Sequence, residues 1–131
     1  MNTTPPILEN LIKTYKTDFG IFHIYPDYVV GQFYEGTALE IDQIFELSTI
    51  AEVHYENKDY AYISYRVNSY ALDPTLYSHI KELENLKGIA IVTKRENDRH
   101  NFKIEQYFYA KNMEIFYNLS EAIDWVYTII D

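Results

Sequence analysis

Two stretches near the start of the sequence predict β-strands, and along the first of them the residues alternate with a period of two. The stretches cover residues 19–25 and 28–35, and both are rich in β-branched and aromatic side chains. Because only a Pro-Asp pair separates them, the two strands are expected to pair antiparallel. Residues 1–17 combine a Pro-Pro pair with apolar residues at helical spacing, so we expect an N-terminal arm or a short helix there.

Apolar residues at i, i+3, i+4 spacing predict a first helix over residues 36–57. Thr37 is the expected N-cap of this helix, and Glu40 completes a capping box three residues later. A second helix is expected over residues 74–84. Asp73 is a good N-cap for it, and the proline that follows suits a first helical turn.

Two more helices are expected in the C-terminal part of the chain. Thr93 and Glu96 form a capping-box pattern that opens a helix over about residues 94–110, although the first half of this stretch is nearly all polar. Asn118 and Glu121 form a similar pattern at the start of a last, strongly amphipathic helix.

Strands alternate with these helices along the rest of the chain. They are expected over residues 59–66, 87–94 and 113–117. The resulting order β-β-α-β-α-β-α-β-α implies right-handed crossovers and an α/β fold. We expect a mainly parallel five-stranded sheet with an antiparallel first strand and four helices, in one domain over residues 18–131.

The composition narrows the functions that this domain can have. A chain of 131 residues can bury a core without disulfides, and this one has no cysteine. Its 20 acidic and 11 basic residues give a net charge of −9, which disfavours nucleic acid and anionic membranes as partners. The sequence shows no secretion signal and no apolar run that could span a membrane. We therefore expect a cytoplasmic protein.

The strongest candidate site is the junction between the strand at 59–66 and the helix at 74–84. In open parallel sheets, ligands bind beyond the carboxyl ends of the strands, where this junction lies. A corner in which polar side chains bond to the local backbone is the simpler alternative. The candidate residues for a partner or ligand surface are Arg66, Asn68, Ser69, Tyr70, Asp73 and Tyr77.

Other patterns that carry chemistry are weak. The glycines stand far apart, which leaves no phosphate-binding loop and no cofactor to expect. A triad of Ser64 or Ser69 with His79 has no Gly-x-Ser-x-Gly turn to support it, so we expect no catalytic residues and no enzyme. No metal site is expected, because the histidines lack the spacing of metal ligands; they are His23, His54, His79 and His100.

The element order resembles that of the STAS domain, the fold of bacterial anti-sigma-factor antagonists. The resemblance is carried by the "EG" before the first helix and by the words "YISYRVNSYALDP", "NLKGIAIVT" and "IFYNLSEAIDWV". These words are similar to those of a STAS-like group found in flavobacteria and their relatives. The match covers about residues 18–130 and implies a small β/α superhelix with its first strand added antiparallel at one edge.

The resemblance also implies a phosphorylation site. In regulatory STAS proteins, a partner kinase phosphorylates a serine in the loop after the third strand. Ser69 is the nearest match here, and Ser64 is the second. The usual Asp-Ser-Ser-Gly pattern differs from this chain, which has no glycine after Ser69 and starts its next helix only at Asp73.

Two functions follow as hypotheses. The first is a non-enzymatic regulatory module of STAS type that binds a protein partner, such as a kinase-type regulator, through residues 66–73 and the helix at 74–84. The chain contains 14 tyrosines, which suit interfaces as well as pocket walls. A homodimer is a further expectation, because a Tyr-rich surface and an exposed first strand favour pairing.

The alternative is a carrier of a small apolar ligand or lipid. CRAL-TRIO lipid carriers share the general winding of the STAS fold at larger size. In this hypothesis, a pocket between the sheet and a helix is lined by Tyr62, Tyr65, Tyr70 and Tyr77.

Overall fold

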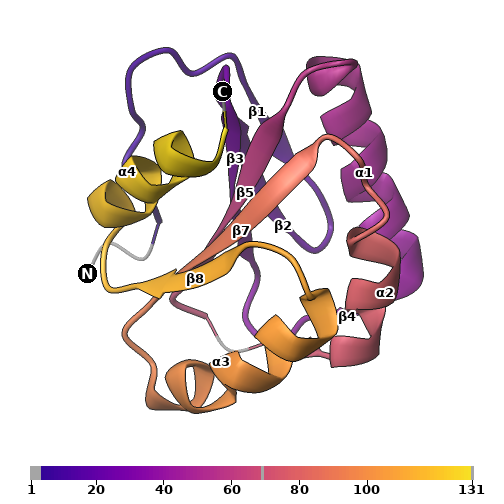
Figure 1. The fold of residues 1–131 in the computed structure, drawn as a ribbon, viewed down its shortest axis with the longest axis vertical. Helices are drawn as coiled ribbons and strands as arrows, with labels where there is room; N and C mark the ends of the chain where they lie inside the picture. The colour runs from indigo at the N-terminus through magenta and orange to yellow at the C-terminus, as the bar shows by residue number, and fades with distance from the viewer. Residues whose placement is uncertain (1–3, 69, 131) are drawn as a thin grey trace.

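A six-stranded sheet forms the centre of the computed structural model, which describes residues 4–68 and 70–130 (Figure 1). Its strands are β1 (Lys13–Lys16), β2 (Gly20–Ile24), β3 (Tyr28–Phe33), β5 (Tyr60–Arg66), β7 (Leu86–Thr93) and β8 (Met113–Phe116). They lie in the order β1-β2-β3-β5-β7-β8. Neighbours from β1 to β3 are antiparallel and those from β3 to β8 are parallel, which confirms the predicted class of sheet.

Helices cover both faces of this sheet. They are α1 (Ile41–Tyr55), the single 3₁₀ turn η1 (Pro74–Leu76) that continues into α2 (Tyr77–Ile80), α3 (Glu96–Tyr109) and α4 (Leu119–Ile129). In Figure 1, α4 lies on one side of the sheet, and α1, α2 and α3 lie on the other. Each face therefore has its own apolar core.

Strand β5 sends its side chains alternately to these two cores, as the pleat of a strand requires. Tyr62, Ser64 and Arg66 face the side that carries α1 and α2. Ile63 and Tyr65 pack in the core beneath α4. The alternation places three polar side chains of one strand in a row on the α1 side.

The N-terminal strand β1 corrects the prediction for residues 1–17, which was an arm or a short helix. It pairs antiparallel with β2, and Thr14 Oγ1 lies 2.8 Å from His23 Nδ1 across the pair. This pairing provides hydrogen-bond partners for the backbone groups along the edge of β2. Their gain outweighs the helical tendency that the spacing of the apolar residues indicates. The sheet therefore has six strands instead of five. The edge expected to pair with a second copy is covered by β1, which carries Lys13 and Lys16.

Helix α1 begins later than predicted, and Thr37 is not its N-cap. A short strand, β4 (Ala38–Leu39), precedes it and pairs in parallel with β6 (Ala71–Leu72). The carbonyl of Thr37 accepts a bond of 2.8 Å from the Ala71 N–H. Glu40 occupies the N-cap instead, and its N–H donates to Gln43 Oε1 at 2.6 Å. The backbone around Thr37 is extended and pairs with β6, so the predicted capping box does not form there.

The predicted starts of two other helices are also displaced. The segment at 74–84 forms only η1 and α2, which ends at Ile80. Arg95, not Thr93, is the N-cap of α3. Thr93 completes β7, and its hydroxyl donates to Asp98 Oδ2 at 2.8 Å, so it does not form the predicted capping box with Glu96.

Two predicted caps are confirmed. Asp73 Oδ1 accepts a hydrogen bond of 2.9 Å from the Thr75 N–H at the start of η1. Asn118 Oδ1 accepts one of 2.9 Å from the Glu121 N–H at the start of α4. In both cases the side chain satisfies an N–H that the helix itself leaves unpaired.

Gly31 in β3 gives the ring of Tyr62 its place on the sheet. A Cβ at position 31 would meet the Tyr62 hydroxyl in a clash, and it would lie 2.7 Å from Tyr62 Cζ and 2.8 Å from Phe22 Cδ1. Real Cβ atoms do not approach other carbon atoms this closely. The absence of a side chain at Gly31 therefore leaves room for the end of the Tyr62 ring over β3.

Gly31→Ala is expected to lower the free energy of unfolding by about 1–3 kcal/mol, because the methyl group overpacks this contact. The loss should be smaller when Gly31→Ala is combined with Tyr62→Phe, since the hydroxyl that clashes most is then absent. Urea unfolding of the two single variants and the double variant measures this coupling. Strictly additive losses would contradict the contact.

Candidate ligand-binding site

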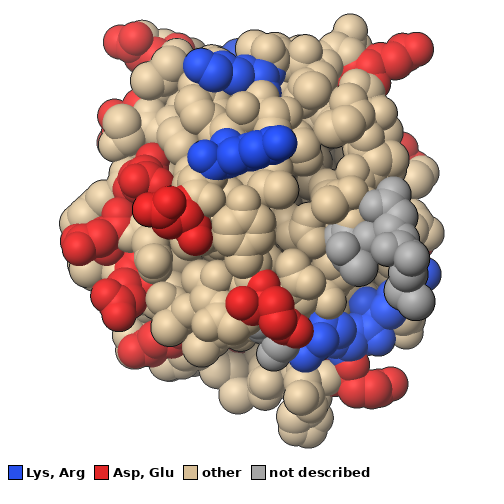
Figure 2. Space-filling view, turned by 180° about the vertical axis from the view of Figure 1, so that it is seen from behind, with Lys and Arg blue, Asp and Glu red and all other residues tan. Residues whose placement is uncertain are grey.

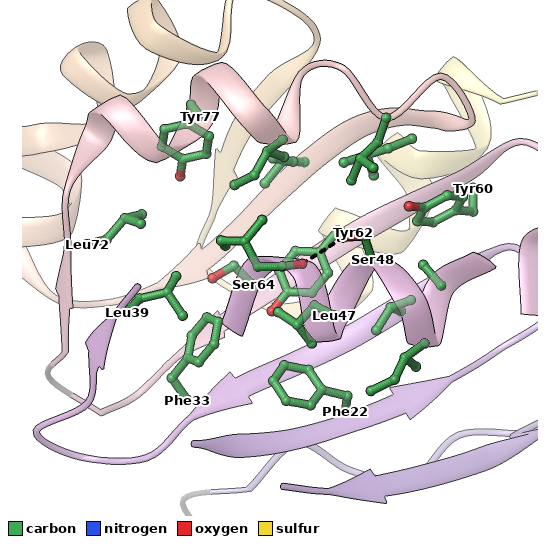
Figure 3. Close-up of a pocket in the computed structure, with 18 of the residues that line it drawn as sticks. Phe22, Phe33, Leu39, Leu47, Ser48, Tyr60, Tyr62, Ser64, Leu72 and Tyr77 are labelled. Carbon is green, nitrogen blue, oxygen red and sulfur yellow. Dashed lines mark hydrogen bonds between the residues drawn. The ribbon is translucent and has the colours of Figure 1, made fainter. Parts of the chain in front are cut away.

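A cavity of about 90 Å³ lies between the sheet and the helices α1 and α2 (Figure 3). Apolar side chains make most of its lining. The sheet contributes Phe22, Val29, Phe33 and Ile89, and α1 contributes Ile44, Leu47 and Ala51. The segment from β6 to just beyond α2 contributes Leu72, Ile80 and Leu83. Figure 3 shows Tyr62 and Ser64 between the phenylalanines of the sheet and the wall formed by Leu72 and Tyr77.

Three of the four tyrosines expected in a pocket line this cavity. They are Tyr62, Tyr70 and Tyr77. Tyr65 does not belong to the set, because the alternation along β5 turns it to the opposite face, where it packs in the core beneath α4.

The hydroxyl of Tyr62 is buried in the cavity wall and has no hydrogen-bond partner within the described part of the chain. A buried hydroxyl without a partner costs about 1–3 kcal/mol relative to a paired one. Burial also raises the pKa of Tyr62 far above its usual value. The oxygen therefore keeps its proton and remains an unused donor.

One end of the cavity is closed by a buried ion pair. The guanidinium of Arg66 donates to both oxygens of Glu105 on α3, at 2.8 and 2.7 Å, and both residues are only 6% exposed. Tyr77 on α2 donates to Glu105 Oε1 at 2.6 Å, and Arg66 Nε donates to Ser64 Oγ at 3.0 Å. The charges thus compensate each other, and the cluster ties β5, α2 and α3 together.

Tyr70 completes this polar end. Its hydroxyl lies 3.4 Å from Ser64 Oγ, and the guanidinium carbon of Arg66 lies 5.5 Å from the centre of its ring. Burial raises the pKa of Tyr70 and that of Tyr77, so both remain protonated hydroxyls. The end wall therefore offers neutral hydroxyls and a neutralised ion pair.

The structure divides the residues of the predicted partner or ligand surface into two groups. Arg66, Tyr70 and Tyr77 come together at the end of the cavity, and Arg66 and Tyr77 are buried. The side chains of Asn68 and Asp73 form hydrogen bonds with backbone groups. Asn68 Nδ2 donates to the Phe33 carbonyl at 3.0 Å, and Asp73 is an exposed cap. Ser69, the candidate phosphorylation site, lies outside the described residues.

Sequence reasoning missed Glu105. The pattern that could have indicated its burial is its place on the apolar side of α3. It follows Phe102 by three residues and precedes Tyr109 by four, and both of these are buried. A buried carboxylate needs a cation, and Arg66 at the end of a buried strand was the available one. The two residues lie 39 positions apart, so only the fold brings them together.

The histidines are not gathered around the cavity. His23 pairs with Thr14, His54 Nε2 lies 2.7 Å from the Tyr15 hydroxyl, and His79 is exposed. Within residues 4–68 and 70–130, no histidine hydrogen bonds to Ser64. The same residues hold no group of three or more histidine, aspartate or glutamate side chains arranged to bind a metal ion.

Of the described helices, none has the length and apolar character needed to cross a membrane.

Breaking the buried ion pair should cost more than replacing it. Arg66→Met and Glu105→Met are each expected to lower the free energy of unfolding by about 3–5 kcal/mol, because each leaves an uncompensated buried charge. The double variant should recover most of that loss. Urea unfolding measures all three, and a double variant as unstable as the sum of its parts would show that the pair does not lie buried as described.

Comparisons with known proteins bear on the fold. No protein-family model matches the sequence, and no curated protein matches it. A crystal structure of an uncharacterised protein of the DUF3478 family, with a SpoIIAA-like fold, from Shewanella loihica, is similar with a TM-score of 0.58. The similarity covers 94% of this chain and 98% of that one, at 12% sequence identity.

At this identity the likeness concerns the fold alone. It extends over nearly the whole of both chains, and the order of strands and helices agrees with the one expected from the resemblance to STAS domains. The protein therefore has a SpoIIAA-like fold of STAS type.

Proposed function

We propose that this domain is a non-catalytic module that binds a small apolar ligand in the cavity and presents a ligand-dependent surface to a protein partner. The observation that carries the proposal is the cavity itself. Protein interiors are close-packed and contain few voids larger than a water molecule. An empty cavity of about 90 Å³ costs roughly 2 kcal/mol at the penalty measured for engineered cavities. A concave, mostly apolar space with a few polar groups is typical of a ligand site.

The size of the cavity favours a small ligand over a lipid. An engineered cavity of roughly 150 Å³ is enough to bind benzene. This cavity, at about 90 Å³, has room for a compact molecule, and a long acyl chain would have to part α1 from the sheet. We therefore narrow the lipid-carrier hypothesis to ligands of a few heavy atoms.

The second half of the proposal concerns the segment that walls the cavity. Tyr70, Leu72 and Tyr77 face the ligand space, whereas Asp73 and Ser78 in the same segment are exposed. A ligand that shifts the backbone of this segment moves the outer side chains together with the inner ones, because they share a short stretch of chain. This segment coincides with the partner surface expected for a regulatory STAS protein.

Phosphorylation at Ser69 would act at the same place. A phosphate adds roughly −1.5 to −2 charge, and Ser69 lies between Asn68 and Tyr70 in sequence. This part of the proposal rests on the resemblance to regulatory STAS proteins alone.

Xenon provides a direct test, because it enters apolar cavities without needing polar contacts. In the wild-type protein, dissolved xenon should shift the methyl NMR signals of Leu47 and Ile89. Ala51→Leu should abolish these shifts, since its side chain fills the cavity from α1. Val53→Leu, two residues along α1 at a site that is 70% exposed, is the matched control and should keep them.

Unshifted methyl signals in the wild-type protein at saturating xenon would refute the proposal. Shifts of equal size in Ala51→Leu would refute it too, because xenon would then be binding elsewhere.

A further inference from the structure

The Tyr62 hydroxyl is a donor with no acceptor among the described residues, although it is buried in the wall of the cavity. The ring that carries it packs over Gly31, where an added Cβ would clash with the ring. Buried polar groups are almost always hydrogen-bonded, and exceptions call for an explanation such as a missing ligand. An acceptor atom on a ligand would remove this deficit.

Among the described residues that line the cavity, no cation is free to bind an anionic ligand. Arg66 is the basic residue in the lining, and both oxygens of Glu105 already accept bonds from it. The remaining polar side chains of the lining carry hydroxyl groups. A carboxylate that entered this space would lose its hydration without gaining a counter-ion.

The surface beside the cavity is acidic. A broader, open groove lies beside it, between the C-terminal half of α1 and residues 82–85, and Ser48, Ala51, Tyr60 and Leu83 line both spaces. The acidic residues of the groove are Glu52, Glu56, Glu82 and Glu84, and its described lining contains no lysine or arginine. Figure 2 shows acidic side chains gathered along the edge of the molecule that carries α1. An anion that approaches the cavity from this groove is therefore repelled.

We propose that the ligand is an uncharged apolar molecule with one hydrogen-bond acceptor, such as a ketone, ester or ether oxygen, and that the acceptor binds the Tyr62 hydroxyl. This inference rests on the proposed function and deepens it. It assigns Tyr62 as the residue that selects the ligand, with the Arg66–Glu105 pair and the acidic groove excluding carboxylates. A short-chain carboxylate is thereby excluded, and its neutral ester or ketone counterpart is accepted.

Three molecules of nearly the same shape test this selection. They are butanone, its methylene analogue in which =CH₂ replaces the carbonyl oxygen, and propanoate, in which O⁻ replaces a methyl group. Methyl NMR titrations give the dissociation constants for the wild-type protein and for Tyr62→Phe. Tyr62→Phe should weaken butanone binding about two- to tenfold, the range for one neutral hydrogen bond, and should not weaken binding of the methylene analogue. Propanoate should bind more weakly than butanone to both proteins.

Tyr65→Phe is the matched control, because it removes the same atom from the same strand on the opposite face. It should leave all three dissociation constants unchanged. Tyr62→Phe should melt at or above the temperature of the wild-type protein, since it loses only an unpaired hydroxyl.

Two results would overturn the inference. Butanone could bind Tyr62→Phe as tightly as the wild-type protein, or propanoate could bind as tightly as butanone. In either case, cavity binding by the methylene analogue would show that the proposed function stands while the assignment of Tyr62 fails. Failure of all three molecules to bind the wild-type protein would reject the proposed function as well.

Discussion

The buried pair of Arg66 and Glu105 is the interaction on which the arrangement around the cavity depends. Arg66 ends β5, and Glu105 lies on the inner side of α3. Their bidentate contact, joined by the hydroxyl of Tyr77, holds α2 and α3 against the carboxyl end of the sheet. A pair of this kind adds little net stability compared with an apolar replacement, but losing one partner is costly. Its effect is therefore to fix the position of the cavity wall.

Tyr62 differs from this fully paired cluster. Its ring lies over Gly31, while its hydroxyl has no hydrogen-bond partner among residues 4–68 and 70–130. A paired polar cluster at one end of the cavity and an unpaired donor in its wall differ in chemistry although both are buried. The first closes the space and removes its charge, and the second gives that space a single directed hydrogen bond. Together they describe a site for a neutral ligand.

The sequence predicted the architecture well where periodicity is strong. The alternation at 19–25, the strand predicted at 28–35 and the apolar run at 87–94 correspond to β2, β3 and β7. It failed where a short segment is decided by long-range pairing. Residues 13–16 become a strand because the edge of β2 is available, and Thr37 gives its carbonyl to the β4–β6 ladder instead of capping α1.

The site was only half predictable for the same reason. The tyrosines at 62, 70 and 77 and the end of the strand at Arg66 follow from local pattern and from the rule for parallel sheets. Glu105 and Gly31 lie far from them in sequence, so their contacts with Arg66 and Tyr62 appear only once the sheet and α3 are assembled. Of the residues predicted for a partner or ligand surface, Arg66 and Tyr77 are buried in the wall of the cavity.

A crystal structure of the protein isolated from the organism that makes it is the most direct measurement of the central claim. The account predicts electron density between the sheet and α1 that no protein atom explains, with one atom at a hydrogen-bond distance of about 2.7 Å from Tyr62 Oη. A core in which α1 is packed onto the sheet, with no space beside Tyr62, would contradict it.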